Sequence, residues 1–222
     1  ARGHAAAVER IAKHHGARNI VRAMLCKRER RDLQESALEA LRAISADNED
    51  VPGEVADNGG VQFVCQALTD FKDFENIQEH GLAALANLAW DSAESQLQIG
   101  DLDGCQHAID MMSLHKDNPR VQAFACALLQ SVACDNQEMR VRIGEIGGVE
   151  AIVEAMRANP KAANVQAFGT SALQSLTVQN LDNARRCHKY KVIELVAAAM
   201  EAHPYSLKLR EFGDLLTETI EG

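Results

Sequence analysis

The sequence has few aromatic residues, few prolines and almost no sign of β-strands. Aromatic residues make up 4% of the 222 residues, and there are four prolines and one tryptophan. No alternating run of β-branched residues is present, which argues against a sheet-based fold. The longest apolar stretches, such as residues 82–90, are far too short to cross a bilayer. Six cysteines occur without a CxxC pair, so we expect reduced thiols in a cytoplasmic protein rather than a disulfide framework.

Catalytic and metal-binding motifs are also missing from the sequence. There is no P-loop, HExxH or GxSxG motif. The segment GDLDG at 100–104 lacks the later ligands of a calcium loop, so we interpret it as a turn. The histidines have no cysteine or carboxylate cluster at metal-ligand spacing. We therefore expect a protein that is not an enzyme, with no catalytic residues, no metal and no cofactor.

Charge is distributed unevenly along the chain. The net charge is −9, which argues against nucleic acid as the main partner. Residues 1–44 carry ten basic and five acidic side chains, whereas residues 45–114 carry fourteen acidic ones and a single basic one. Three interpretations stay open: a solvated acidic exterior, an electrostatic guide for a basic partner, or pairing of the basic start with the acidic segment of another copy.

What the sequence does contain is a repeat of 44 residues without insertion or deletion. Glycines, glutamines and leucines each recur at this spacing. The three columns are Gly16, Gly60, Gly104 and Gly148; Gln34, Gln78, Gln122 and Gln166; and Leu41, Leu85, Leu129 and Leu173. A fixed period in this range indicates stacked helical units that bury their apolar faces only against one another. The repeated glutamine is expected to bond the backbone of a neighbouring unit.

Residues 136–179 show how one unit folds. Asn136 is expected to cap a short helix, which the glycine pair at 147–148 ends, and a second helix follows up to the Asn159-Pro160 step. A third, longer helix is predicted over about 164–178, with an apolar stripe at helical spacing. Ser92 and Asn180 occupy the same cap position, as does Asn48. Small residues recur on the third helix where it must approach a neighbour closely: Ala37, Gly81, Ala125, Gly169 and Gly213.

This pattern resembles the armadillo repeat family. The resemblance is carried by EMRVRIGEIGGVEAIVEAM at 138–156, by NVQAFGTSALQSL at 164–176 and by IQEHGLAALANLA at 77–89. It covers essentially the whole chain and implies an all-α, right-handed α-solenoid of about five three-helix repeats. The expected units of this single domain, 1–222, are 1–47, 48–91, 92–135, 136–179 and 180–222. The two-helix HEAT repeat is the closest alternative fold.

The resemblance implies a groove lined by the third helices that holds an extended peptide or a helix. The tryptophan–asparagine ladder of the importin-type members is absent, so nuclear localisation signals are not the expected ligand. Phe124 and Phe168 share one column, which fits either shallow pockets or packing between units. The residues predicted to line the groove are Glu35, Glu39, Glu79, His80, Ala83, Asn87, Trp90, Phe124, Ala127, Ser131, Phe168, Ser171 and Ser175.

We therefore expect a non-catalytic scaffold or adaptor that binds a protein partner, with its acidic units favouring a basic one. The chain opens at Ala1 rather than at Met, so we expect it to be part of a longer protein. Two alternatives stay open. One is an adaptor held peripherally at an organelle membrane by an anchor upstream of this chain; the other is the regulatory array of a larger multidomain enzyme.

Overall fold

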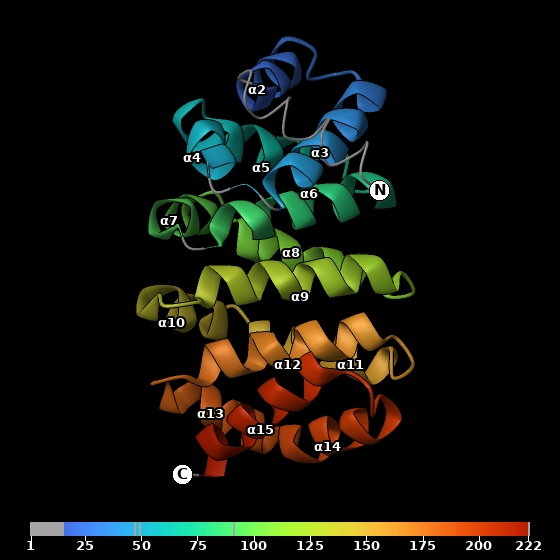
Figure 1. Ribbon diagram of the computed structural model, residues 1–222, viewed down its shortest axis with the longest axis vertical. Helices are drawn as coiled ribbons and strands as arrows, with labels where there is room; N and C mark the ends of the chain where they lie inside the picture. Colours follow the sequence, from blue (N-terminus) through green and yellow to red (C-terminus); the bar gives the residue numbers. More distant parts are fainter. Residues whose placement is uncertain (1–15, 47, 49, 91, 222) are drawn as a thin grey trace. The chain divides into compact units, whose positions relative to one another are not determined.

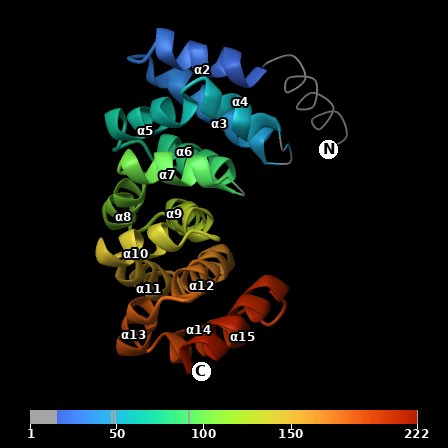
Figure 2. The same ribbon diagram turned by 90° about the vertical axis from the view of Figure 1, so that its left-hand side faces the viewer.

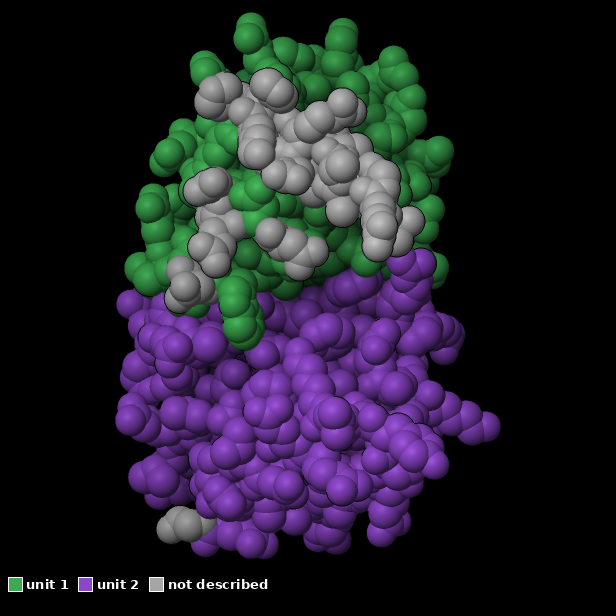
Figure 3. Space-filling model, in the orientation of Figure 1, with its two compact units in different colours: residues 1–104 green, residues 105–222 purple. Residues whose placement is uncertain are grey.

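The computed structural model describes residues 16–46, 48, 50–90 and 92–221, and these residues form helices and turns without strands. The chain divides into two compact units, residues 1–104 and 105–222 (Figure 3). The first helix expected for the first repeat falls within residues 1–15, outside the described residues.

Short helices of 8 or 9 residues, helices of 11 residues and long helices of 15 residues follow one another along the chain in both units (Figure 1). In residues 1–104 they are α2 (Gly16–Cys26), α3 (Arg31–Ser45), α4 (Asp50–Asp57), α5 (Gly60–Asp70), α6 (Glu75–Ala89) and α7 (Ala93–Asp101). From Gly104 onward they are α8 (Gly104–Leu114), α9 (Pro119–Ala133), α10 (Gln137–Glu145), α11 (Gly148–Ala158), α12 (Ala163–Thr177), α13 (Leu181–Lys189), α14 (Val192–Ala202) and α15 (Leu207–Glu221). The longest helices, α3, α6, α9, α12 and α15, each have 15 residues.

The helix starts follow the local signals in the sequence. The backbone N–H of Met139 donates to the side chain of Asn136 at 3.1 Å, so Asn136 caps α10 as predicted. Ser92 and Asn180 accept equivalent bonds and cap α7 and α13. Each cap satisfies one of the N–H groups that have no partner inside the helix. Asn48 adjoins a residue outside the described ranges, and its predicted cap stays a prediction.

The turn between the first and second helices needs a left-handed backbone at one position. Gly59 and Gly147 adopt it, with φ of 71° and 89°. Asp103 and Lys191 stand at the same position of their repeats and adopt it too, with φ of 56° and 55°. A residue with a side chain is strained in this region. Asp103 and Lys191 adopt it nonetheless, so the turn keeps its geometry where glycine is replaced.

The predicted close approach of the third helix is confirmed. A Cβ atom on Gly81 would lie 2.4 Å from Cδ2 of Leu68, and one on Gly169 would lie 2.7 Å from Cγ of Met156. Leu68 and Met156 belong to α5 and α11, so the tight contact is between the second and third helices of one repeat. The core below is fully buried and consists mainly of leucine, valine and isoleucine, including Leu85, Leu129 and Leu173.

Candidate partner-binding surface

The predicted surface lies on the long third helices. In residues 105–222, α9 and α12 lie side by side, and α15 packs on the other side of α12 (Figures 1 and 2). In residues 1–104, α3 packs against α6 in the same way. The first and second helices cover the inner face of each long helix, as α10 and α11 do for α12. The opposite flank therefore remains for contact with another molecule.

In residues 1–104 the predicted groove residues differ widely in exposure. Trp90 follows the last residue of α6 and is 56% exposed, and Glu39 is also exposed. Glu35, His80 and Asn87 are partly buried. Glu79 and Ala83 are each 5% exposed, so they contribute little to an open surface.

Several of these polar groups join α3 to α6. Oε1 of Glu35 accepts a hydrogen bond from Nδ2 of Asn76 at 2.9 Å. Nδ2 of Asn87 donates to the carbonyl oxygen of Arg42 at 3.2 Å and lies 3.3 Å from Oγ of Ser45. The predicted partner-facing asparagine therefore already uses its donor to hold two neighbouring third helices together. A ligand at this position would therefore contact an Asn87 side chain that is already bonded to α3.

In residues 105–222, Phe124 and Phe168 are partly buried. This lies between the two outcomes that the sequence left open, which are shallow pockets on the surface and packing between units. Ala127, Ser131 and Ser175 are between 5% and 8% exposed. Small side chains at these positions let the third helices pack closely, and the neighbouring helix then covers them.

The sequence pattern predicts Ser171 on the open groove, and this prediction is wrong. Ser171 is fully buried, at 0% exposed, and its hydroxyl has no hydrogen-bond partner among the described residues. The side chain is therefore not on the open flank where the repeat pattern predicts it. The reason is that α12 packs between α9 and α15, which leaves little room beside a serine in the middle of the helix.

The sequence pattern missed one residue of this surface, Lys208. Its Nζ lies 4.5 Å from the ring centroid of Phe168 and 5.7 Å from that of Phe212. Burial lowers the pKa of Lys208 from its usual value, and the nearby Glu211 opposes this shift. A signal was available, because Lys208 precedes Phe212 by four residues, which places both on one face of α15.

The glutamine column is structural, but it does not act between units as predicted. Nε2 of Gln166 donates to the carbonyl oxygens of Met156 and Asn159, at 2.8 and 2.9 Å. Gln34, Gln78 and Gln122 make the same pair of bonds in their own repeats. Each amide therefore ties the third helix to the end of the second helix of the same repeat.

The thiol groups are mostly hidden. Burial raises the pKa of Cys65, Cys126 and Cys187 to about 12, and Glu150 adds to the shift at Cys187. Such thiols are poor nucleophiles. Among the described residues, no three His, Cys, Asp or Glu side chains come together as metal ligands would. Within those same ranges, no helix combines the length and the apolar character that a membrane span requires.

Known proteins share this repeat and this fold. The family model for the LRRK2 ARM repeat matches residues 17–213. No curated protein matches the chain. An engineered protein of known crystal structure has a TM-score of 0.82 at 21% identity, over 98% of this chain and 84% of that one.

Designed armadillo repeat proteins are similar as well. One gives a TM-score of 0.81 at 14% identity, over 96% of this chain and 85% of that one. A second, whose structure is a complex with the peptide (KR)4, gives 0.78 at 14% identity, over 96% and 85% of the two chains. At these identities the structural likeness establishes the fold, an α-helical armadillo solenoid.

Proposed function

The chain belongs to the LRRK2 ARM repeat family, and from that premise we propose that it is a non-catalytic scaffold for a protein partner. The partner is a basic peptide, or a helix with basic side chains, held along the third helices. Armadillo folds often serve as protein-binding scaffolds, and one designed member with a similar fold is known in complex with the peptide (KR)4.

One observation carries the basic character of the partner: the ammonium group of Lys208 over the ring of Phe168 at 4.5 Å. A cation is attracted to the negative face of an aromatic ring. The chain thus holds one of its own cations at a residue of the proposed surface. A lysine or arginine of a partner could use the same ring by displacing Lys208.

The distribution of charge supports the same proposal. Residues 45–114 carry fourteen acidic side chains and one basic one, Lys72. Exposed charges of one sign steer an oppositely charged partner and raise its association rate. Trp90, which lies within this acidic region of the sequence and is 56% exposed, adds an aromatic surface that could contact the partner.

Fluorescence anisotropy with a labelled peptide of four Lys-Arg repeats tests the proposal, with a peptide of four Glu-Asp repeats as the charge control. We expect saturable binding of the basic peptide alone. Because an exposed cation–π contact is worth about 0.5–1 kcal/mol, Phe168→Ala should weaken binding about two- to fivefold. Leu181→Ala, at a residue 74% exposed on α13, is the matched control and should leave binding unchanged.

The association rate gives a second readout. It should fall with rising salt, because charge steering is screened beyond about 8 Å at physiological ionic strength. Equal binding of both peptides, or equal losses in Phe168→Ala and Leu181→Ala, would refute the proposed surface.

A further inference from the structure

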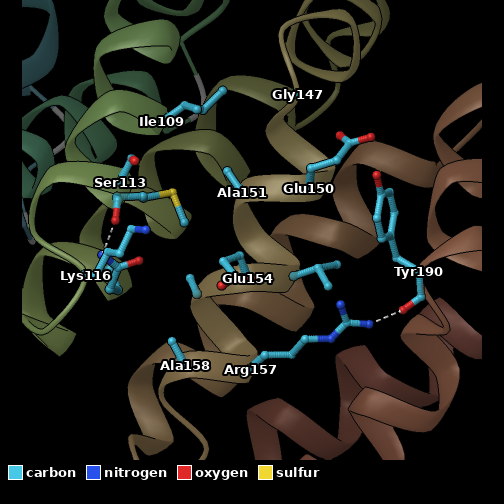
Figure 4. A pocket seen from close by; sticks show the side chains of 14 residues that line it. Ile109, Ser113, Lys116, Gly147, Glu150, Ala151, Glu154, Arg157, Ala158 and Tyr190 are labelled. Atoms are coloured by element: carbon cyan, nitrogen blue, oxygen red, sulfur yellow. Dashed lines mark hydrogen bonds between the residues drawn. The ribbon is translucent and has the colours of Figure 1, made fainter.

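A cavity of about 430 Å³ opens between α8 and α11 in residues 105–222 (Figure 4). It is lined mainly by the second helices of two successive repeats, with Lys116 after α8, Gln122 from the covered side of α9 and Tyr190 from the turn before α14. The proposed peptide surface uses the third helices instead, so the cavity is a separate feature. Its volume lies within the range of small-molecule pockets, about 300–1,000 Å³.

The cavity exists because α11 carries an alanine where other repeats carry a larger side chain. Ala151 lines it, and the equivalent positions one repeat of 44 residues away are Phe63, His107 and Leu195. Ala155 and Ala158 extend the same hollow along α11. The space is therefore a local property of this repeat, and the chain itself shows that a large side chain is compatible with the position.

The floor of the cavity is apolar. Met112 and Val153 line it and are buried, and Ile109 lies near Gly147, at the start of α11 (Figure 4). Transfer of an apolar group from water onto such a surface is favourable by about 25 cal/mol for each Å² buried. A ligand with a compact apolar body fits this part of the cavity.

Two cations stand at the opposite end. Lys116 follows the last turn of α8 and Arg157 lies in the last turn of α11, so both are where these helices end (Figure 4). Nη2 of Arg157 donates to the carbonyl oxygen of Tyr190 at 2.6 Å, which fixes the guanidinium at the edge of the cavity. A held guanidinium loses little freedom when it binds an anion, which favours binding.

Two acidic groups, Glu150 and Glu154, line the cavity from α11. Glu150 accepts a bond from Nη1 of Arg186 at 3.1 Å, so its charge is already compensated. Its other oxygen, Oε2, is buried and has no hydrogen-bond partner among the described residues. Glu154 lies between Glu150 and Arg157 on α11. Because Glu150 is paired with Arg186, Glu154 is the lining carboxylate that disfavours an anionic group.

We propose that this cavity binds a small apolar anion. The apolar body lies over Ala151 and Val153, and a carboxylate, sulfonate or phosphate group binds Lys116 and Arg157. A helix of a protein partner is the competing occupant.

Two dyes with the same apolar body test the proposal on the intact chain. 8-Anilinonaphthalene-1-sulfonate carries a sulfonate, and N-phenyl-1-naphthylamine lacks it. We expect the sulfonate dye to bind at one site per chain, measured by fluorescence and calorimetry. Ala151→Phe fills the cavity and should weaken its binding at least about tenfold, since burial of a large apolar group is worth about 1.5–3 kcal/mol.

Charge variants separate the anionic contact from the apolar one. Arg157→Gln and Lys116→Gln should each weaken the binding of the sulfonate dye about tenfold, because a hydrogen bond to a charged group is worth about 1.5–3 kcal/mol. Binding of the neutral dye should stay the same in both. Glu154→Gln should strengthen the binding of the sulfonate dye. Arg210→Gln on α15 is the matched control and should leave binding unchanged.

Ala151→Leu is a second variant that fills the cavity, in case Ala151→Phe does not fold. Circular dichroism checks the fold of both variants. Equal affinity of both dyes in the wild-type chain, or dye binding that survives both fillings of the cavity in folded protein, would overturn the proposal. Loss of binding in Ala151→Phe without any effect of the charge variants would also overturn it and would favour the apolar face of a partner helix.

Discussion

Replacement of Gln166 by leucine should destabilise the protein by much more than an average surface change. The side chain is 1% exposed, and its Nε2 donates two hydrogen bonds, at 2.8 and 2.9 Å. Leucine fills most of the space but leaves the carbonyl oxygens of Met156 and Asn159 without this donor. A buried polar group without its partner costs about 1–3 kcal/mol, and water at the partly buried end offsets part of it, so we expect a loss of about 2–4 kcal/mol.

Urea unfolding followed by circular dichroism measures this loss, and thermal unfolding should shift by about 5–15 °C for a chain of this length. Repeat arrays can open in parts, so hydrogen exchange should be measured as well. The largest increase in exchange is expected at the end of α11, at the N–H groups of Asn159 and Ala162, which donate to the backbone there.

Gln137→Leu is the matched control, since Gln137 is exposed; its amide donates a 3.1 Å bond to the carbonyl oxygen of Gln179 and accepts a long 3.4 Å bond from Nη1 of Arg140. It should change stability by less than about 0.5 kcal/mol. A loss below this value for Gln166→Leu, or exchange that rises equally in every helix, would refute the idea that this amide holds the end of α11.

Three further predictions concern packing, backbone and thiols. Gly81→Ala should cost about 1–3 kcal/mol in urea unfolding through overpacking against Leu68, whereas Gly53→Ala, with open space around it, should stabilise by about 1 kcal/mol. Lys191→Gly should raise the melting temperature, because it relieves a left-handed backbone at φ of 55° that costs about 1 kcal/mol or more for a residue with a side chain. Among the six thiols, exposed Cys26 should react rapidly with a thiol reagent in the native chain, while buried Cys65, Cys126 and Cys187 should react only after unfolding. Their pKa is raised to about 12 from 9.0, so the stability they contribute should persist up to about pH 9 and fall as the pH rises towards 12, as measured by urea unfolding across that range.

The helices and their ends could be predicted from the sequence, because the responsible signals are local. Asn136 caps α10, the Gly147 turn separates α10 from α11, and Gly169 marks a close approach, all as expected. Each of these needs only a side chain and the backbone next to it, or a short contact within one repeat. A repeat multiplies such signals, since the same residue type recurs wherever the same contact does.

The site was harder to predict, since exposure depends on how closely neighbouring helices pack. Ser171 and Phe168 are both on α12, yet one is fully buried and the other partly exposed. Spacing alone cannot tell the middle of a packed flank from its rim. The glutamine column shows a similar limit, because its recurrence indicated a structural role and not whether the bonds stay within the repeat.

The cavity and the cation over Phe168 were missed for another reason. The cavity arises where one repeat departs from the others, with Ala151 in a column of larger residues. Lys208 stands in a column of mixed residues, Asp32, Asn76, Arg120 and Asn164, so no recurrence drew attention to it. Comparison of each column for its exceptions, as well as for its recurring residues, would have drawn attention to the cavity.

We propose above all that a basic partner binds along the third helices. Chemical shift mapping of the isotopically labelled chain, titrated with the peptide of four Lys-Arg repeats, tests it most directly. We expect the largest saturable shifts in α9, α12 and α15, around Phe124, Phe168 and Lys208. Shifts confined to the first and second helices, or small shifts spread evenly over the acidic surface, would contradict it.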